Sequence, residues 1–132
     1  KMEPRNLMKK FCVSVGLLQP GDSRDIIVDI LYVLLRAKSD QRIMTSEQVN
    51  IEVRKLREEH NLVLLGVAPS NVRRQIKRLR DLLLVEKIRN NYRIHEFSPL
   101  SDSYKEKFEQ YLLPSVVSRI NEYFREIDRV FN

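Results

Sequence analysis

Cysteine, glycine, tryptophan and long apolar runs are all scarce in this sequence. Its 132 residues include one cysteine (Cys12), three glycines and no tryptophan. A single thiol excludes an intramolecular disulfide and a cysteine-rich zinc site, so we expect Cys12 to pack as a small apolar side chain. No apolar stretch approaches the roughly 20 residues of a membrane span, and no signal-peptide pattern opens the chain. We therefore expect no membrane association and a cytoplasmic location.

Residues that perform catalysis or bind metals and cofactors are also few. The two histidines, His60 and His95, fall in different predicted elements without a nearby cysteine or a paired-carboxylate motif, and Glu58-Glu59 beside His60 end a charged helix face that should be solvated. The glycines are isolated, so no glycine-rich loop is present to bind phosphate. No Ser-His-Asp or Cys-His grouping follows from the spacing. The sequence thus predicts no catalytic residue, no metal site and no cofactor, and it leaves a small-molecule effector unknown.

Positive charge is concentrated in one short stretch. Residues 70–93 contain eight bases and two acids, a local balance of +6, which equals the net charge of the whole chain. The other 108 residues therefore sum to zero. A polyanion-binding surface produces this kind of concentration, whereas a merely basic protein spreads its charge.

The first half of this stretch has the periodicity of an amphipathic helix. Val72, Ile76, Leu79 and Leu83 recur at spacings of four, three and four, which predicts one buried face. The helix starts near residue 70, either with Ser70 as the N-cap or with Ala68 as the cap and Pro69 as the first helical residue. The positions predicted to lie opposite or beside the buried face are Ser70, Asn71, Arg73, Arg74, Lys77, Arg78 and Asp81.

The second half predicts a hairpin of two short strands. Two runs rich in Val, Ile and Tyr are separated by Arg89-Asn90-Asn91, and Asn90-Asn91 is suited to the turn because Asn tolerates positive φ. The predicted inward-facing residues are Leu84, Ile88, Tyr92 and Ile94, and the basic tip would contain Lys87, Arg89 and Arg93.

Three elements are predicted before the basic helix. A helix capped by Asp22 or Ser23 has an apolar face broad enough to make it the central buried helix. Residues 42–44 suit a single edge strand that pairs with the hairpin. Thr45 and Gln48 form a capping box for the next helix, which ends near residue 59. Its inward positions are Val49, Val53 and Leu56, and its solvated positions are Arg54, Lys55, Arg57, Glu58 and Glu59.

The connection at residues 60–67 is more apolar than most loops. We expect Leu62, Leu64 and Leu65 either to pack on the core or to form an extra short turn.

Helices are predicted at both ends of the chain. Residues 1–21 contain an N-terminal helix with Leu7, Phe11, Val15 and Leu18 on one face. Residues 98–132 form a helical region that Pro114 should divide or kink. Its long apolar seam needs a partner, and we expect it to pack with the N-terminal helix, within one chain or across a homodimer. The proposed dimerisation residues are Phe108, Leu112, Val116, Ile120, Phe124, Ile127 and Phe131.

The order helix, strand, helix, helix and two-stranded wing across residues 22–97 resembles the winged-helix class of helix-turn-helix DNA-binding domains. The run GVAPSNVRRQIKRLRDLLLVEKI carries the likeness, with a Gly-containing turn, a recognition helix and a leucine before the first wing strand. This chain departs from the family in having Leu83 where Gly is common, and in a longer turn before the recognition helix. The flanking helices are similar to those of dimeric regulators of the multiple-antibiotic-resistance and phenolic-acid-response types. The resemblance implies a mainly α fold whose recognition helix enters the major groove of DNA and whose wing contacts the backbone or minor groove.

The sequence therefore leads to one function and one alternative. The first is sequence-specific binding of double-stranded DNA by a homodimeric transcription regulator. In it, Arg73, Arg74, Lys77 and Arg78 contact phosphates or guanine, Asn71 reads adenine, and the wing residues Lys87, Arg89, Asn90, Asn91 and Arg93 lie against the DNA backbone. The alternative is an interaction module in a larger assembly, whose basic face binds an acidic protein or RNA.

Overall fold

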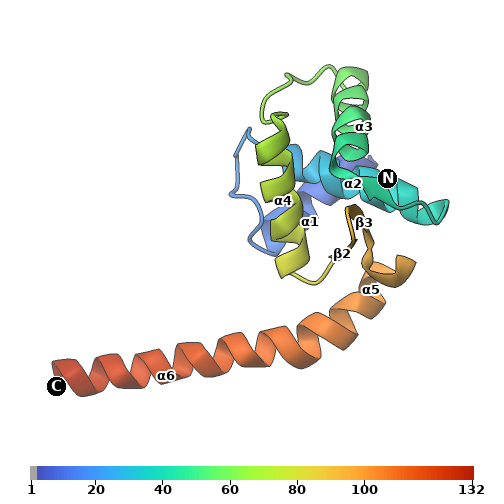
Figure 1. Cartoon of the computed structure of the whole chain (residues 1–132). Coiled ribbons are helices and arrows are strands. Elements are labelled where there is room, and N and C mark those ends of the chain that lie inside the picture. Colours follow the sequence, from blue (N-terminus) through green and yellow to red (C-terminus); the bar gives the residue numbers. More distant parts are fainter. Residues whose placement is uncertain (1–2) are drawn as a thin grey trace. The chain divides into compact units, whose positions relative to one another are not determined.

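The computed structural model describes residues 3–132 as a mainly helical chain with a small three-stranded antiparallel sheet (Figure 1). The chain divides into two compact units, one ending at Phe97 and the other spanning Ser98–Asn132. The elements of the first unit are α1 (Pro4–Ser14), α2 (Ile26–Ser39), β1 (Met44–Thr45), α3 (Ser46–Glu59), α4 (Pro69–Asp81), β2 (Val85–Ile88), β3 (Asn91–Ile94) and the short 3-10 turn η1 (His95–Phe97).

Helix α2 is the core of the first unit, as the sequence predicts. Nine of its residues are buried, and α1, α3 and α4 all pack against it. Cys12 of α1 is also fully buried, and burial raises the pKa of its thiol to about 11. The expectation that this cysteine packs as an apolar side chain is therefore confirmed.

The start of α2 differs from the prediction. The helix begins at Ile26 and not after a cap at Asp22 or Ser23. The Asp22 carboxylate instead accepts a hydrogen bond from the Arg24 backbone N–H at 2.9 Å. Asp25 holds the N-cap position without capping the helix, because its carboxylate is engaged by basic side chains.

Those basic side chains belong to a buried ionic cluster that joins three helices. Arg5 of α1 contacts Asp29 of α2 at 2.9 Å and Asp25 at 3.1 Å. Arg57 of α3 contacts the same two carboxylates at 2.6 and 3.1 Å, and Lys9 reaches Asp25 at 3.2 Å. Buried charges persist only when they are paired and hydrogen-bonded, so this cluster fixes the positions of α1 and α3 on α2.

The ionic cluster corrects two predictions. Arg57 was expected in water but is 3% exposed, because it pairs with the two carboxylates of α2. In α1 the buried residues are Arg5 and Cys12, while Leu7 is exposed. Of the predicted face, Leu18 is buried, Phe11 and Val15 are half-buried and only Leu7 is exposed, because the inner side of α1 is partly ionic.

The sheet has the strand order β1-β3-β2. Val85 pairs with Ile94 and Lys87 with Tyr92 in the hairpin, and Met44 of β1 pairs with the other side of Tyr92. The predicted pairing of an edge strand with the hairpin is confirmed, with the strand displaced to Met44–Thr45. The predicted inward positions Leu84, Tyr92 and Ile94 are buried, but Ile88 is exposed near the hairpin tip.

The start of α3 follows the predicted capping box. The Thr45 hydroxyl accepts from the Gln48 backbone N–H, and the Gln48 side chain accepts from the Thr45 backbone N–H. These two bonds satisfy donors that the first turn leaves free. Val49, Val53 and Leu56 face the core as predicted.

The second unit is helical throughout. It contains α5 (Leu100–Ser103), the π-helical segment η2 (Tyr104–Leu112) and α6 (Leu113–Phe131), which follow one another as a continuous helix in Figure 1. The change from π-helix to α-helix comes one residue before Pro114. Proline lacks the N–H that would bond to the preceding turn, which accounts for a change of helical type at this point.

Candidate nucleic-acid interface

Helix α4 carries most of the basic stretch, and its apolar face is closed. Val72, Ile76 and Leu79 are fully buried against α2 and α3. The helix begins with Ala68 as the cap and Pro69 in the first turn, so the second of the two predicted starts is confirmed. Ser70 therefore lies within the first turn and is exposed. With one face buried, only the basic face of α4 meets the solvent.

The cap at the end of α4 gives Leu83 a backbone conformation that favours glycine. Leu84 N–H donates to the Leu79 carbonyl and Leu83 N–H to the Arg80 carbonyl, the bond pattern of a Schellman cap. This cap places Leu83 at φ +64°, a conformation that costs an ordinary residue roughly 1–2 kcal/mol. Leu83 is thus outside the helix and only half-buried, although its spacing predicted a fourth position on the apolar stripe.

The connection from α3 to α4 is fastened by three side chains. Arg57 donates to the Val63 carbonyl, Asn50 to the Val67 carbonyl and Asn71 to the Gly66 carbonyl, each at 2.8 Å. These bonds hold the N-terminal end of α4 even though the connection is long.

The apolar side chains of that connection do not pack on the core. Leu62 is half-buried, while Leu64 and Leu65 are exposed together with Val63. The predicted packing of Leu64 and Leu65 on the core is therefore wrong, whereas the Leu65 N–H donates to the Val63 carbonyl at 2.9 Å in a short turn. The anchoring comes from hydrogen bonds to backbone carbonyls, which apolar content does not reveal.

Asn71 has a structural position at the start of α4. Its amide nitrogen donates to Gly66, and its oxygen accepts from Arg74 at 2.6 Å and from Gln75 at 3.1 Å. Gly66 has φ +77°, and a Cβ there would meet the Asn71 amide at 3.0 Å. The Asn71 amide thus holds the turn, and reading an adenine would require it to exchange these bonds.

Three arginines line a cavity of about 570 Å³ beside α4. Arg74 and Arg78 come from the helix, and Arg24 comes from the connection between α1 and α2. Arg78 is held by the Leu17 carbonyl and by the Gln75 side chain, both at 2.9 Å. No sequence pattern predicts a role for Arg24, because it is a lone base next to an acid and becomes part of a basic cluster only through the fold.

A second, shallower hollow of about 380 Å³ joins α4 to the hairpin. Its lining includes Lys77 and Arg80 from α4 and Lys87 from β2, together with Asp81 and Glu86. Lys77 pairs with Asp81 at 3.2 Å, but both side chains are about two-thirds exposed, so the pair is weak. The exposed cations of the helix and of the strand therefore border one surface.

The hairpin tip differs from the prediction by one residue. Ile88 pairs with Asn91, so the turn residues are Arg89 and Asn90, and Asn91 is the first residue of β3. Arg89 takes the positive φ, at +58°, which was expected of an asparagine. This turn presents the Arg89 side chain to solvent at the tip.

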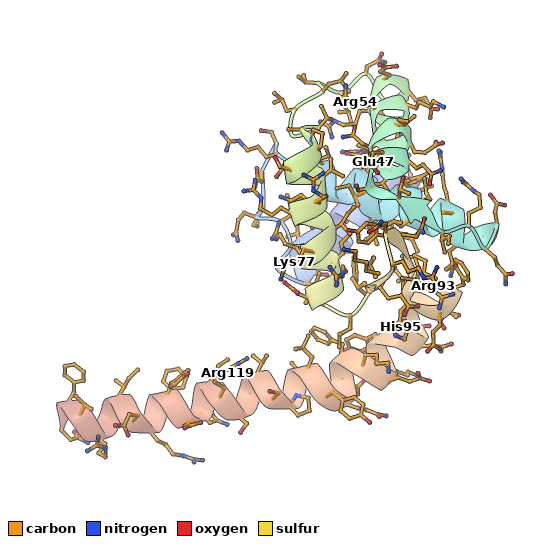
Figure 2. The ribbon with its side chains drawn as sticks, viewed as in Figure 1. Glu47, Arg54, Lys77, Arg93, His95 and Arg119 are labelled. Atoms are coloured by element: carbon orange, nitrogen blue, oxygen red, sulfur yellow. The ribbon has the colours of Figure 1, made fainter. Side chains whose placement is uncertain are left out.

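Of the other two bases of the wing, Arg93 has an ion pair and Lys87 has none in the part of the chain that the structure describes. Arg93 contacts Glu86 at 2.7 Å and lies over the Phe97 ring at 4.8 Å. Burial raises the pKa of Glu86, but bonds from the Glu96 backbone and from Arg93 outweigh it and hold the pKa below its usual value. Lys87 lies 5.9 Å from the Tyr92 ring centre, a contact that leaves its charge available. Figure 2 labels Lys77 on α4 and Arg93 on β3.

The basic residues of this surface thus fall into two groups. Arg78 and Arg93 are held by protein partners, as is Arg74 through Asn71. Within residues 3–132, no salt bridge or hydrogen bond engages the side chains of Arg73, Arg80, Lys87 or Arg89. Arg80 was counted in the charge of the stretch but was not predicted as a site residue.

The predicted dimerisation residues all lie in the second unit. Phe108, Leu112 and Val116 are half-buried, and the remaining four are exposed on α6: Ile120, Phe124, Ile127 and Phe131. The N-terminal helix, which was expected to pack with this seam, is part of the first unit and packs on α2.

Comparisons of the chain with protein-family models, with curated proteins and with solved structures found no match. None of the helices in residues 3–132 combines the length and apolarity needed to cross a membrane. In the same residues, no three His, Cys, Asp or Glu side chains are grouped as metal ligands would be.

Proposed function

We propose that this chain binds double-stranded DNA through α4 and the β2–β3 hairpin, as a homodimeric transcription regulator with a winged-helix domain. The main support for this proposal is the basic surface that α4 shares with the β2–β3 hairpin. The apolar face of α4 is closed by the core, and its outer face adjoins the wing with four unengaged cations: Arg73, Arg80, Lys87 and Arg89.

The dimensions of α4 suit this role. Its 13 residues span about 20 Å, and a B-DNA major groove about 12 Å wide admits an α-helix. Arginine has a planar fork that matches the O6 and N7 acceptors of guanine. The arrangement of α2, β1, α3, α4 and the β2–β3 hairpin, with the strand order β1-β3-β2, supports the winged-helix assignment.

The protein contacts that each cation already makes indicate which site residues are available to contact DNA. Arg73 and Lys77 are exposed one turn apart on α4, and Lys77 has only a weak, solvent-exposed pair with Asp81, so both are proposed to contact DNA directly. Arg89 at the hairpin tip and Lys87 beside it are proposed to contact phosphates. Arg74 and Arg78 border the 570 Å³ cavity with Arg24, where a backbone phosphate would meet three guanidinium groups.

The test is a salt titration of duplex binding by fluorescence anisotropy, with the variant Arg73→Gln/Lys77→Gln. Its matched control, Lys10→Gln/Lys55→Gln, removes two exposed cations from α1 and α3 and gives the same loss of charge. Loss of two phosphate contacts should lower the slope of log affinity against log salt by about 2, and affinity by on the order of tenfold. The control should keep the slope of the unsubstituted chain.

Two results would count against DNA binding. Equal losses in the variant and its control would mean that only net charge matters. Absence of duplex binding at low salt, together with salt-sensitive binding of an RNA or an acidic protein, would favour the interaction-module alternative.

A further inference from the structure

Helix α6 has a regular apolar seam that the second unit does not cover. The seam residues alternate spacings of four and three, so equivalent positions recur every seven residues, the heptad pattern of paired helices. Their side chains range from 39% to 83% exposed. The seam consists of Leu113, Val117, Ile120, Phe124, Ile127 and Phe131.

The two flanks of this seam differ in chemistry. One flank is apolar and contains residues spaced seven apart, Val116, Tyr123 and Val130. The opposite flank contains Pro114 and the polar residues Asn121 and Asp128, and it has no large apolar side chain. A partner helix must therefore offer an apolar flank on one side of the seam and a polar flank on the other.

A second copy of α6 meets this requirement in only one direction. In a parallel pair each flank faces the opposite flank of the other helix, which would place Tyr123 against Asp128 of the second copy. In an antiparallel pair each flank faces its own equivalent, so apolar residues meet apolar residues and Asp128 stays away from Tyr123. The asymmetry of the flanks thus favours the antiparallel direction.

The antiparallel register can also be read from the seam. A pair centred near Glu122 sets Ile120 against Phe124, Val117 against Ile127 and Leu113 against Phe131 of the second copy, so every seam residue has a partner. On the apolar flank, Tyr123 meets Tyr123. On the polar flank Asn121 meets Asn121, and Asp128 meets Pro114, so no like charges are opposed.

Charge and size agree with self-association. The charged residues of α6 are three bases and three acids, so two copies do not repel. A stable interface of standard size buries about 800 Å² per partner. The seam and the apolar flank together supply nine apolar side chains, among them Tyr123, Phe124 and Phe131, which would form the apolar centre of such an interface.

We propose that α6 pairs with α6 of a second copy in antiparallel orientation, centred on residues 121–123. This proposal rests on the proposed homodimer but not on DNA binding. The two helices would run past each other over the 19 residues of α6, about 28 Å.

Cysteine cross-linking distinguishes the two directions. Asn121→Cys places a thiol opposite itself only in the antiparallel pair, whereas Val117→Cys does so only in a parallel, in-register pair. The native Cys12 is fully buried, so the unsubstituted chain serves as the control without background cross-linking. Under mild oxidation we expect a covalent dimer from Asn121→Cys and little from Val117→Cys.

Light scattering and duplex binding on the same samples separate the possible failures. A dimeric mass with cross-linking only through Val117→Cys would overturn the antiparallel pairing. A monomeric mass at micromolar concentration would overturn the dimer, and retained duplex binding would show that the proposed function survives without it. Ile120→Asp should raise the dimer dissociation constant by on the order of 100-fold, because it places a charge within the seam. Unchanged dimer dissociation in that variant would also overturn the pairing.

Discussion

Helices α4 and α6 are both amphipathic, but they differ in what covers their apolar faces. Ile76 of α4 is 0% exposed, whereas Ile120 of α6 is 46% exposed, and no residue within the described helix α6 is buried. Their polar faces also differ, because α4 has five bases against one acid and α6 has equal numbers. Amphipathicity therefore predicts that a helix packs but does not say against what. Because the core covers the apolar face of α4, this helix exposes mainly its basic side chains. Helix α6 exposes its apolar face as well.

The largest expected effect comes from the buried cluster that supports helix α4. Arg57→Ala should lower the free energy of unfolding by about 3–5 kcal/mol, because it leaves Asp25 and Asp29 with less compensating charge in a buried site. It also removes the hydrogen bond to Val63 that anchors the turn before α4. Urea denaturation followed by circular dichroism measures the loss.

The control for that variant is Lys55→Ala, which removes an exposed base from the same helix. It should stay within about 0.5 kcal/mol of the unsubstituted chain. If the two variants lost equal stability, the cluster would contribute no more than surface charge.

A matched pair of isoleucines tests the comparison itself. Ile76→Ala should destabilise the first unit by about 2–5 kcal/mol, because it opens a cavity in a packed core. Ile120→Ala should leave the unfolding of the first unit unchanged and should instead weaken the dimer. Denaturation at low protein concentration measures the first effect, and light scattering across a dilution series measures the second. If Ile76→Ala and Ile120→Ala destabilised the first unit equally, the apolar face of α6 would not be exposed as described.

Acid should weaken the first unit through Asp25. Burial raises the pKa of this carboxyl, but hydrogen bonds and charge from Arg5, with those from Lys9 and Arg57, outweigh burial and hold it below its usual value. A carboxyl with a lowered pKa in the folded state stabilises the fold fully above its unfolded pKa of about 3.9. That stability is lost as pH falls through the folded pKa.

The measurement is the free energy of unfolding from pH 6 down to the lowest pH at which the chain folds. Below about pH 4 it should fall more steeply in the unsubstituted chain than in Asp25→Asn, which cannot titrate at this position. If the free energy of unfolding depended on pH in the same way in both proteins, Asp25 would not be the cause of the acid sensitivity.

The smallest expected effect is that of Arg89→Gly at the hairpin tip, which tests backbone strain through stability and charge through DNA binding. Arg89→Gly removes an exposed side chain from a residue at φ +58°, where glycine has no steric penalty. We expect stability to be unchanged or to rise by up to about 1 kcal/mol, while the salt slope of duplex binding falls by about 1. Thermal denaturation and the anisotropy titration give the two values. A weaker fold with an unchanged salt slope would show that Arg89 serves the turn and not a phosphate.

Local patterns predicted most of the elements and several of their ends. The Thr45–Gln48 capping box, the buried stripe of α4 and the broad apolar face of α2 all depend on neighbours in the chain or on periodicity, whereas the predicted edge strand pairs with residues far along the chain. The charge of the site was likewise readable, because the bases are close together in sequence.

What the tertiary structure alone decided were the partners of charged and polar side chains. Arg5 and Arg57 look like surface bases in sequence, yet they are buried because the fold brings Asp25 and Asp29 to them from residues far along the chain. Arg78 became an anchor in the same way, through the Leu17 carbonyl, and Arg24 joined the basic cavity. Sequence determined which segments are helical, apolar or basic, since those properties are local. Which charges remain free was decided by long-range packing, because pairing depends on distances that only the folded chain sets.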